Sequence, residues 1–278
     1  MTNTLAHLSD LHFGLCPRME ARVRALARTL ATAEIGHVVV SGDLTHRGQQ
    51  GELERFSLAV QPLRDTTAMS VVPGNHDRLG DDVAGSIMAD HRVLASSYDE
   101  LYMVRLDSTA PHNCRYPFEG HGMLTDQDLE RLDDALGRAP RGVLTVVTMH
   151  HHPLPLPEEG ILERLSSWIG LPYAAELATG PELLACLRGR CDLLLHGHRH
   201  VPSGWVLPGG HRPLSVFNAG SSPQLGRVRV FEHRDGRLLG PPRWLQLPPS
   251  SPHSLAAERR PPAGWPHVEP QGGTAALQ

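Results

Sequence analysis

Five short segments of the chain carry side chains that commonly bind divalent metal ions. Each lies at the end of an apolar run, and together they are Asp10-Leu11-His12, Gly42-Asp43, Gly74-Asn75-His76-Asp77, His150-His151-His152 and Gly197-His198-Arg199-His200. Imidazole, carboxylate and amide groups without thiolates suit Mn, Fe, Zn or Co rather than soft ions. Open sheets place their ligand sites outside the carboxyl ends of the strands. Five such ends therefore predict a centre with two metal ions.

The spacing within the segments supports this prediction. Residues two apart in an extended segment point to the same side, so Asp10 and His12 can face one metal ion together, as can His198 and His200. Asp43 is a single carboxylate at a sharp turn, which suits it to bridge two cations about 3.5–4 Å apart. Each segment alone could be an ordinary polar turn, but five in order at strand ends favour the metal centre.

Two of the segments raise questions of orientation. Asn75 offers a neutral carbonyl oxygen to a metal ion, so its neighbour His76 is expected to point elsewhere. In the histidine triplet, extended backbone lets His151 face the metal ions alone, or lets His150 and His152 face them together, but not all three. The residues themselves leave this choice of register open.

The elements that position these segments alternate between strand and helix in the first half of the chain. Apolar runs predict the strands, and apolar residues at helical spacing predict the helices. The expected order is a strand at 4–9, a helix at 18–34, a strand at 38–40, a helix at 50–63 and a strand at 69–72. Such alternation is typical of a parallel sheet covered by helices.

The second half predicts more strands with different connections. Helices are expected across 79–95, 125–137 and 181–188, and buried strands at 101–106, 143–149 and 192–195. The later strands near 205, 214–217 and 228–231 have short links, which suggests antiparallel pairing. Asp235-Gly236 indicates a hairpin after the last of them.

Composition predicts one domain, residues 1–247, followed by a Pro-rich tail, 248–278, with too few apolar residues to offset the entropy of ordering. The proline-punctuated excursion at 154–180 is expected to be a rim or lid, or else a contact in a homodimer.

The charge pattern excludes several classes of function. All 26 basic residues are arginine, so chemistry that needs a lysine Schiff base or a phosphate-loop lysine is excluded. The net charge of -4 and the lack of a basic tract argue against general nucleic-acid binding. No apolar run is long enough to span a membrane and no leader opens the chain, so a cytoplasmic location without membrane attachment is expected.

The five segments, taken in order, resemble the signature blocks of calcineurin-like metallophosphoesterases. The resemblance covers about residues 4 to 240. It implies a four-layer αββα sandwich, in which two mixed β-sheets are flanked by helices and the metal site lies at the strand carboxyl ends. The opening Leu8-Ser9-Asp10-Leu11-His12-Phe13-Gly14 and the His-His-Pro segment are most similar to class III cyclic-nucleotide phosphodiesterases.

The resemblance also implies a role for each residue. It places Asp10, His12, Asp43 and His200 on one metal ion, and Asp43, Asn75, His151 and His198 on the other. His151 is chosen because the family pattern is a ligand histidine, one further residue and then proline, here Pro153. His76 matches the histidine that protonates the leaving group, with Asp77 as its structural companion. His121 and Arg115 are candidates for substrate contacts.

The expected function is therefore phosphodiester hydrolysis with two divalent metal ions, Mn or Fe before Zn or Co. A hydroxide held between the ions would attack phosphorus in line. The substrate is expected to be a small phosphoester, with a 3',5'-cyclic nucleotide as first candidate. The alternatives are a nucleotide-sugar or nucleotide-lipid pyrophosphatase, a phosphomonoesterase, and a non-catalytic scaffold of the same fold.

Overall fold

The computed structural model describes residues 2–114, 120–154 and 176–247. Within these ranges the chain forms two six-stranded sheets. The first sheet contains β1 (Asn3–Leu8), β2 (His37–Ser41), β3 (Ala68–Val72), β10 (Arg227–Arg234), β11 (Arg237–Leu238) and β12 (Arg243–Gln246). The second contains β4 (Val93–Tyr98), β5 (Leu101–Leu106), β6 (Leu144–Thr148), β7 (Leu193–His196), β8 (Ser203–Leu207) and β9 (Leu214–Asn218).

Both sheets are mixed. In the first, β1, β2 and β3 are parallel neighbours, and the antiparallel β10 lies beside β1 and pairs with both β11 and β12. In the second, the order is β4-β5-β6-β7-β9-β8, with a parallel centre from β5 to β9 and antiparallel edge strands. The parallel strands bring their carboxyl ends to a common edge of each sheet, where the predicted ligands lie.

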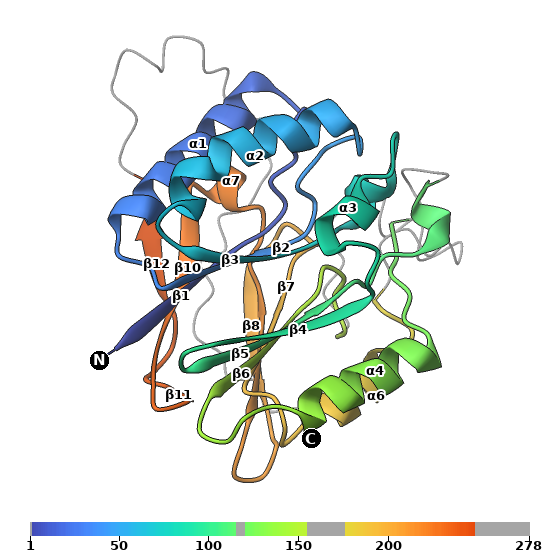
Figure 1. Ribbon diagram of the computed structural model, residues 1–278, viewed down its shortest axis with the longest axis vertical. Helices are drawn as coiled ribbons and strands as arrows, with labels where there is room; N and C mark the ends of the chain where they lie inside the picture. The colour runs from blue at the N-terminus through green and yellow to red at the C-terminus, as the bar shows by residue number, and fades with distance from the viewer. Residues whose placement is uncertain (1, 115–119, 155–175, 248–278) are drawn as a thin grey trace.

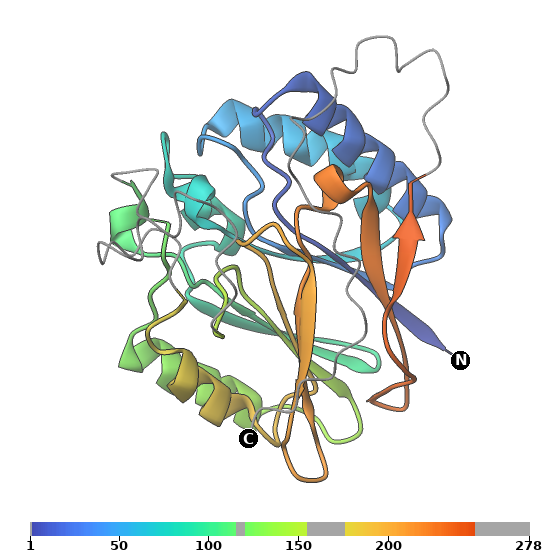
Figure 2. The ribbon, with the colours of Figure 1, turned by 180° about the vertical axis from the view of Figure 1, so that it is seen from behind.

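Helices cover the outer face of each sheet (Figure 1). The longer helices are α1 (Pro17–Thr32), α2 (Gln50–Arg64), α4 (Asp126–Gly137) and α6 (Gly180–Leu187), and the short ones are α3 (Ala84–Met88), α7 (Ser222–Leu225) and the 3-10 helices η1 (Asn75–Arg78) and η2 (Pro111–Cys114). Helices α1 and α2 pack on the first sheet, and α4 and α6 on the second, while the two sheets face each other between them (Figures 1 and 2; Figure 2 shows the view from behind). The predicted four-layer αββα arrangement is confirmed.

Alternation along the strands explains the three apolar layers. In β1 and β2, Leu5 and Val39 point into the layer between the sheets, whereas Ala6, Val38 and Val40 pack against the first pair of helices. Strands that are apolar on both faces can lie only in the middle of such a sandwich. The continuous run Val38-Val39-Val40 is therefore the central strand that its composition indicates.

Some boundaries differ from the prediction. The helix expected across 79–95 is reduced to α3, and the strand β4 begins at Val93. This strand lies at an edge of the sheet and is only partly buried along its length, so it lacks the apolar signal of a central strand. The predicted hairpin is present, since Asp235 and Gly236 link β10 to β11 with φ values of 50° and 70°.

The expected excursion and tail fall mostly on residues outside the described ranges. At the base of the excursion, the amide of Leu177 donates to the carbonyl of His152 at 3.0 Å, so the chain leaves and returns at one point beside the triplet. The tail at 248–278 is not described. Among the described residues, no helix combines the length and the apolar character needed to cross a bilayer.

Candidate metal centre

The candidate ligands lie within a few residues of the ends of their strands. Asp10, Asp43, His150 and His198 each follow the last residue of β1, β2, β6 or β7 by two positions, and Asn75 follows β3 by three. The two sheets meet at this edge, because the Nδ1–H of His150 donates to the Ser41 carbonyl at 2.7 Å. Segments far apart in the sequence are thus brought into one polar site.

Four side chains form what we call the first ligand cluster: Asp10, His12, Asp43 and His200. One donor atom of each lies within 4.8 Å of the donor atoms of the others. The Nε2 atoms of His12 and His200 are 3.0 Å apart, and His200 Nε2 lies 3.4 Å from Asp10 Oδ1. His12 Nε2 is also 3.6 Å from Asp43 Oδ2. Two carboxylates and two imidazoles therefore converge on one point.

Asp43, Asn75, His150 and His198 form the second ligand cluster. The Asn75 side-chain oxygen lies 3.2 Å from His150 Nε2 and 3.0 Å from His198 Nδ1. Asp43 Oδ1 is 3.5 Å from His150 Nε2. Asp43 thus turns Oδ2 to the first cluster and Oδ1 to the second, which is the orientation that a bridging carboxylate requires.

The structure does not place His151 as predicted. Its Nε2–H donates to the Gly120 carbonyl at 2.9 Å, and its Nδ1 lies 2.8 Å from the Ser108 hydroxyl, so both nitrogens are engaged away from the clusters. His150 instead presents Nε2 to Asn75 and Asp43. The alternation of a strand cannot fix this register, because β6 ends at Thr148 and the triplet lies in irregular backbone.

The backbone at the ligands is unusual. Asp10, His12, Asp43, His198 and His200 all have positive φ, between 45° and 77°. The left-handed conformation costs a non-glycine residue of order 1 kcal/mol or more, and such strain is concentrated at functional sites. Asp10 and His12 therefore face the same side because of turns, as do His198 and His200. The sequence had suggested that the alternation of an extended backbone would do this. Space is also tight, since a side chain at Gly74 would overlap the Asp43 carboxylate.

The carboxylate of Asp77 stabilises the turns after β2 and β3, and it makes no hydrogen bond to the ring of His76. Its carboxylate accepts hydrogen bonds from the amides of Leu44, Thr45 and Gly74 at 2.8–3.2 Å and from the Thr45 hydroxyl at 2.7 Å. Burial, and next the charge of Asp43, raise the pKa of Asp77 to about 6. Its predicted place as companion of the His76 ring is therefore corrected: it joins the turn after β2 to the turn after β3.

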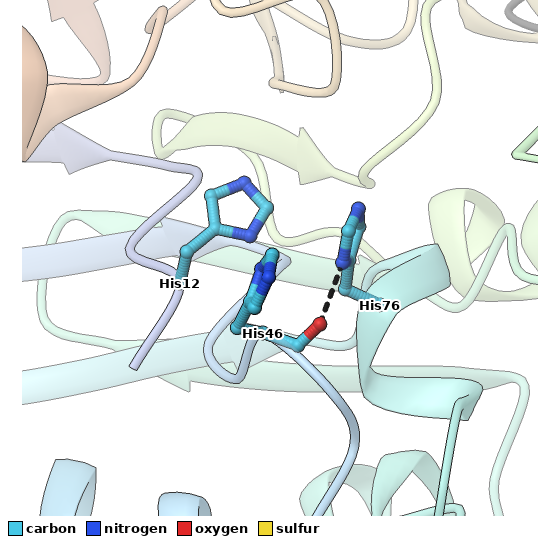
Figure 3. Close-up of side chains that lie close together, drawn as sticks. All are labelled: His12, His46 and His76. Carbon is cyan, nitrogen blue, oxygen red and sulfur yellow. Dashed lines mark hydrogen bonds between the residues drawn. The ribbon is translucent and has the colours of Figure 1, made fainter. Parts of the chain in front are cut away.

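His76 lies beside the first ligand cluster, half-buried. Its amide donates to Asp43 Oδ1 at 2.9 Å, and its Nδ1–H donates to the His46 carbonyl at 2.8 Å (Figure 3). The ring meets His12 edge-on with centroids 4.7 Å apart and stacks on His46 at 5.4 Å. Nε2 is the nitrogen left to act on a ligand. The ring of His46 belongs to the same group.

A polar segment after β9 holds the ligand loops in place. The Ser221 hydroxyl donates to the Asp10 carbonyl at 3.0 Å, and the Ser9 amide donates to the Ser222 hydroxyl at 3.1 Å. The side-chain amide of Asn218 donates through Nδ2 to the Gly197 carbonyl at 2.8 Å. The run Asn218-Ala219-Gly220-Ser221 at a strand end was the sequence signal for this role, and Ser222 carried none.

Charge in the site is divided between ionised carboxylates and mostly neutral imidazoles. Burial lowers the pKa of His12 to about 3, against the pull of Asp43. Burial acts in the same direction on His150, but the neighbouring charge of Asp43 outweighs it and raises the pKa of His150 to about 9. The pKa of Asp43 is held low against burial by His150 and His76.

One arginine near the site, Arg78, is already paired. Arg78 donates to Thr109 Oγ1 at 2.8 Å, to Asp107 at 3.0 Å and to Asp82 at 3.2 Å. Of the two predicted substrate contacts, Arg115 lies outside the described residues. The His121 ring stacks on His112 with centroids 3.9 Å apart, in the loop that follows β5.

The residues fit two divalent metal ions. Neutral imidazole nitrogens and carboxylate or amide oxygens converge in two adjoining groups that share one carboxylate, and His150 would give up its proton on binding. This mixed nitrogen and oxygen donor set suits first-row transition metals. By contrast a cleft of about 940 Å³, lined among others by Arg141, Arg212 and Phe217, contains none of the ligand residues.

Known proteins resemble this chain in sequence pattern and in fold. A family model described as calcineurin-like phosphoesterase matches residues 4–202. No curated protein sequence matches the chain significantly.

Solved structures with the same fold have very different sequences. A dimetal phosphatase from Danio rerio has a TM-score of 0.59 at 12% identity, covering 88% of this chain and 99% of its own. A purple acid phosphatase from yellow lupin (Lupinus luteus) seeds has a TM-score of 0.60 at 12% identity, covering 85% of this chain, which spans only 50% of the lupin chain. GAP50, the anchor in the inner membrane complex of Plasmodium, has a TM-score of 0.53 at 11% identity, covering 88% of both chains. At these identities the likeness concerns the fold.

Proposed function

Because the chain belongs to the calcineurin-like phosphoesterase family, we propose that it hydrolyses a phosphodiester with two divalent metal ions, Mn or Fe. The first ligand cluster would hold one ion, and the second ligand cluster, with His150 in place of the predicted His151, would hold the other. Two bound ions supply Lewis-acid stabilisation of the phosphoryl oxygens and an activated water. The chain's own residues hold the ions, orient the ester and deliver a proton.

His76 is the residue proposed to deliver that proton. Its Nδ1–H is committed to the His46 carbonyl, so transfer to a leaving oxygen must come from Nε2 of the imidazolium form. The His76 amide is bonded to Asp43 and the ring lies against His12, which keeps Nε2 beside the first ligand cluster. General acid catalysis of this kind contributes roughly 10²–10⁴-fold for a leaving group that needs protonation.

The proposal that the substrate is a diester rests on the pairing of Arg78. A monoester dianion brings one more negative charge than a diester monoanion and is favoured by additional cations around the phosphate. Arg78, two residues after His76, has its guanidinium directed to Asp82, Asp107 and Thr109. An arginine committed in this way does not add charge at the metal site. A 3',5'-cyclic nucleotide is the first candidate, because its ribose alkoxide requires a proton donor such as His76.

The test compares bis(p-nitrophenyl) phosphate with p-nitrophenyl phosphate, and then cyclic AMP with AMP, on protein loaded with Mn. We expect a higher kcat/KM for the diester in each pair. Faster turnover of both monoesters would reject the diesterase and support a phosphomonoesterase. Activity confined to nucleotide-linked pyrophosphates would support the pyrophosphatase alternative, and a protein that binds no metal ion would be the scaffold.

A further inference from the structure

His12, like His198, has a buried ring nitrogen without a hydrogen-bond partner, within the residues that the structure describes, on the side that faces away from its ligand cluster. A histidine that binds a metal ion usually donates its other ring N–H to a nearby acceptor, which fixes the tautomer and the ring. His150 does so through Nδ1–H and the Ser41 carbonyl at 2.7 Å. His12 points Nε2 at His200, but its Nδ1 is buried and has no hydrogen-bond partner among the described residues.

The ring of His46 is placed to accept a hydrogen bond from the Nδ1 of His12. One ring nitrogen of each of His12, His46 and His76 lies within 4.8 Å of the others. The His12 and His46 rings meet edge-on with centroids 5.7 Å apart, and Figure 3 shows a nitrogen of His12 directed toward His46. The Nδ1 of His46 is likewise buried and unpartnered within the described part of the chain.

The backbone holds His46 in this position independently of its ring. Its amide donates to the Phe13 carbonyl at 2.8 Å, and its carbonyl accepts the Nδ1–H of His76. Two polar atoms less than 4.8 Å apart can be joined by one bridging water, which binds nearly as well as a direct contact. Both backbone bonds would survive removal of the imidazole, so the side chain can be tested by itself.

We propose that His46 is a positioning residue for the first metal ion. Its Nδ1 accepts, through one water molecule, the Nδ1–H of His12. This bond keeps the lone pair of His12 on Nε2, facing Asp10, Asp43 and His200. The inference rests on the proposed function, because it assumes that the first ligand cluster holds a metal ion.

Direct ligation by His46 is the competing role, and the contacts disfavour it. His76 has only Nε2 to offer, since its Nδ1 is bonded to the His46 carbonyl. His12 would have to bind one ion through Nδ1 while Nε2 faces the first cluster, which requires a doubly deprotonated imidazole. A third ion in this group is therefore an outcome of the test and not the proposal.

The experiment measures metal affinity by competition with a chromophoric chelator, without reference to activity. Wild type should bind two ions. His46→Ala should weaken the first by about 10–100-fold, the effect usual for loss of such a partner. His46→Gln, which keeps an acceptor oxygen, should recover most of the affinity, and His91→Ala should match wild type because that histidine is exposed and outside both clusters.

A second set of variants, made in a protein that already carries His150→Ala, shows which ion loses affinity. In His150→Ala, where only the first cluster should bind, adding His46→Ala should show the same 10–100-fold loss, with a shifted absorption spectrum of bound Co(II). Circular dichroism checks that each variant is folded. Wild type binding fewer than two ions would contradict the proposed function itself. Two ions bound equally well by wild type and His46→Ala would overturn this inference, as would a third ion that the variant loses.

Discussion

The two ligand clusters share Asp43 but differ in charge and in access to solvent. The first has two carboxylates and two imidazoles, and the side chain of His200 is 39% exposed. The second has only the shared carboxylate, with the neutral amide of Asn75 and two imidazoles, and its His150 is fully buried. His76 and His46 lie beside the first cluster. The more anionic cluster thus includes the 39% exposed side chain of His200, and His76, the proposed proton donor, lies beside it.

This difference in charge indicates that the two clusters would have different roles. A buried cluster with few charges can fix the distance to the shared carboxylate. An open cluster with more negative charge can neutralise its ion and still admit a ligand.

The largest effect is expected for Asp43→Asn, because both clusters depend on this carboxylate. The variant should bind neither ion firmly, and kcat/KM should fall by at least about 10⁴-fold, or about 5 kcal/mol. Metal analysis after gel filtration checks the stoichiometry. Retention of one tightly bound ion would show that the clusters are independent.

The second prediction separates two adjacent histidines. His150→Ala should lose the ion of the second cluster while keeping the first, with a loss of activity of roughly 10³-fold. His151→Ala should keep both ions and lose about 1–3 kcal/mol of stability, because the Gly120 carbonyl loses its donor and the Ser108 hydroxyl hydrogen loses its acceptor. The opposite metal content in the two variants would restore His151 as the ligand.

The third prediction concerns the leaving-group side of the first cluster. His76→Ala should lower kcat by about 10²–10⁴-fold for an alkyl ester, and by far less for a nitrophenyl ester, whose leaving group needs no proton. Metal content should not change. Equal losses with both esters would assign His76 to substrate binding.

The smallest effect is on the stability of the metal-free protein, where His150 and His12 should respond to pH with opposite sign. The pKa of His150 is raised to about 9, so its stabilising contribution is present below pH 6.5 and disappears as pH rises to 9, a loss of about 3 kcal/mol. The pKa of His12 is lowered to about 3, so its contribution increases as pH rises from 3 to 6.5. Urea unfolding at a series of pH values measures both contributions. His150→Gln should remove only the pH dependence of stability between pH 6.5 and 9, and His12→Gln only that between pH 3 and 6.5.

Much of the fold could be predicted because the central strands carry their own signal. Val38-Val39-Val40 is apolar on both faces, and that pattern fits only a strand between two layers. The edge strand β4 was missed because exposure removes the apolar signal, and the partly buried Val93–Tyr98 reads as irregular polar sequence. Residues 155–175 and 248–278 lie outside the described ranges, so their predictions stand as they were.

The residue types along the chain specify which groups come to the site and in what order. A metal ligand must have a suitable donor atom, and a strand end is recognisable locally, so Asp10, Asp43 and Asn75 could be found from the chain alone. Tertiary structure decided which nitrogen of which histidine faces the centre. His150 and His151 are chemically identical neighbours, and they are oriented by Ser41 at the end of β2 and by Ser108 and Gly120 in the segment between β5 and α4. Those partners are 31 to 109 residues away along the chain, and local alternation carries no information about them.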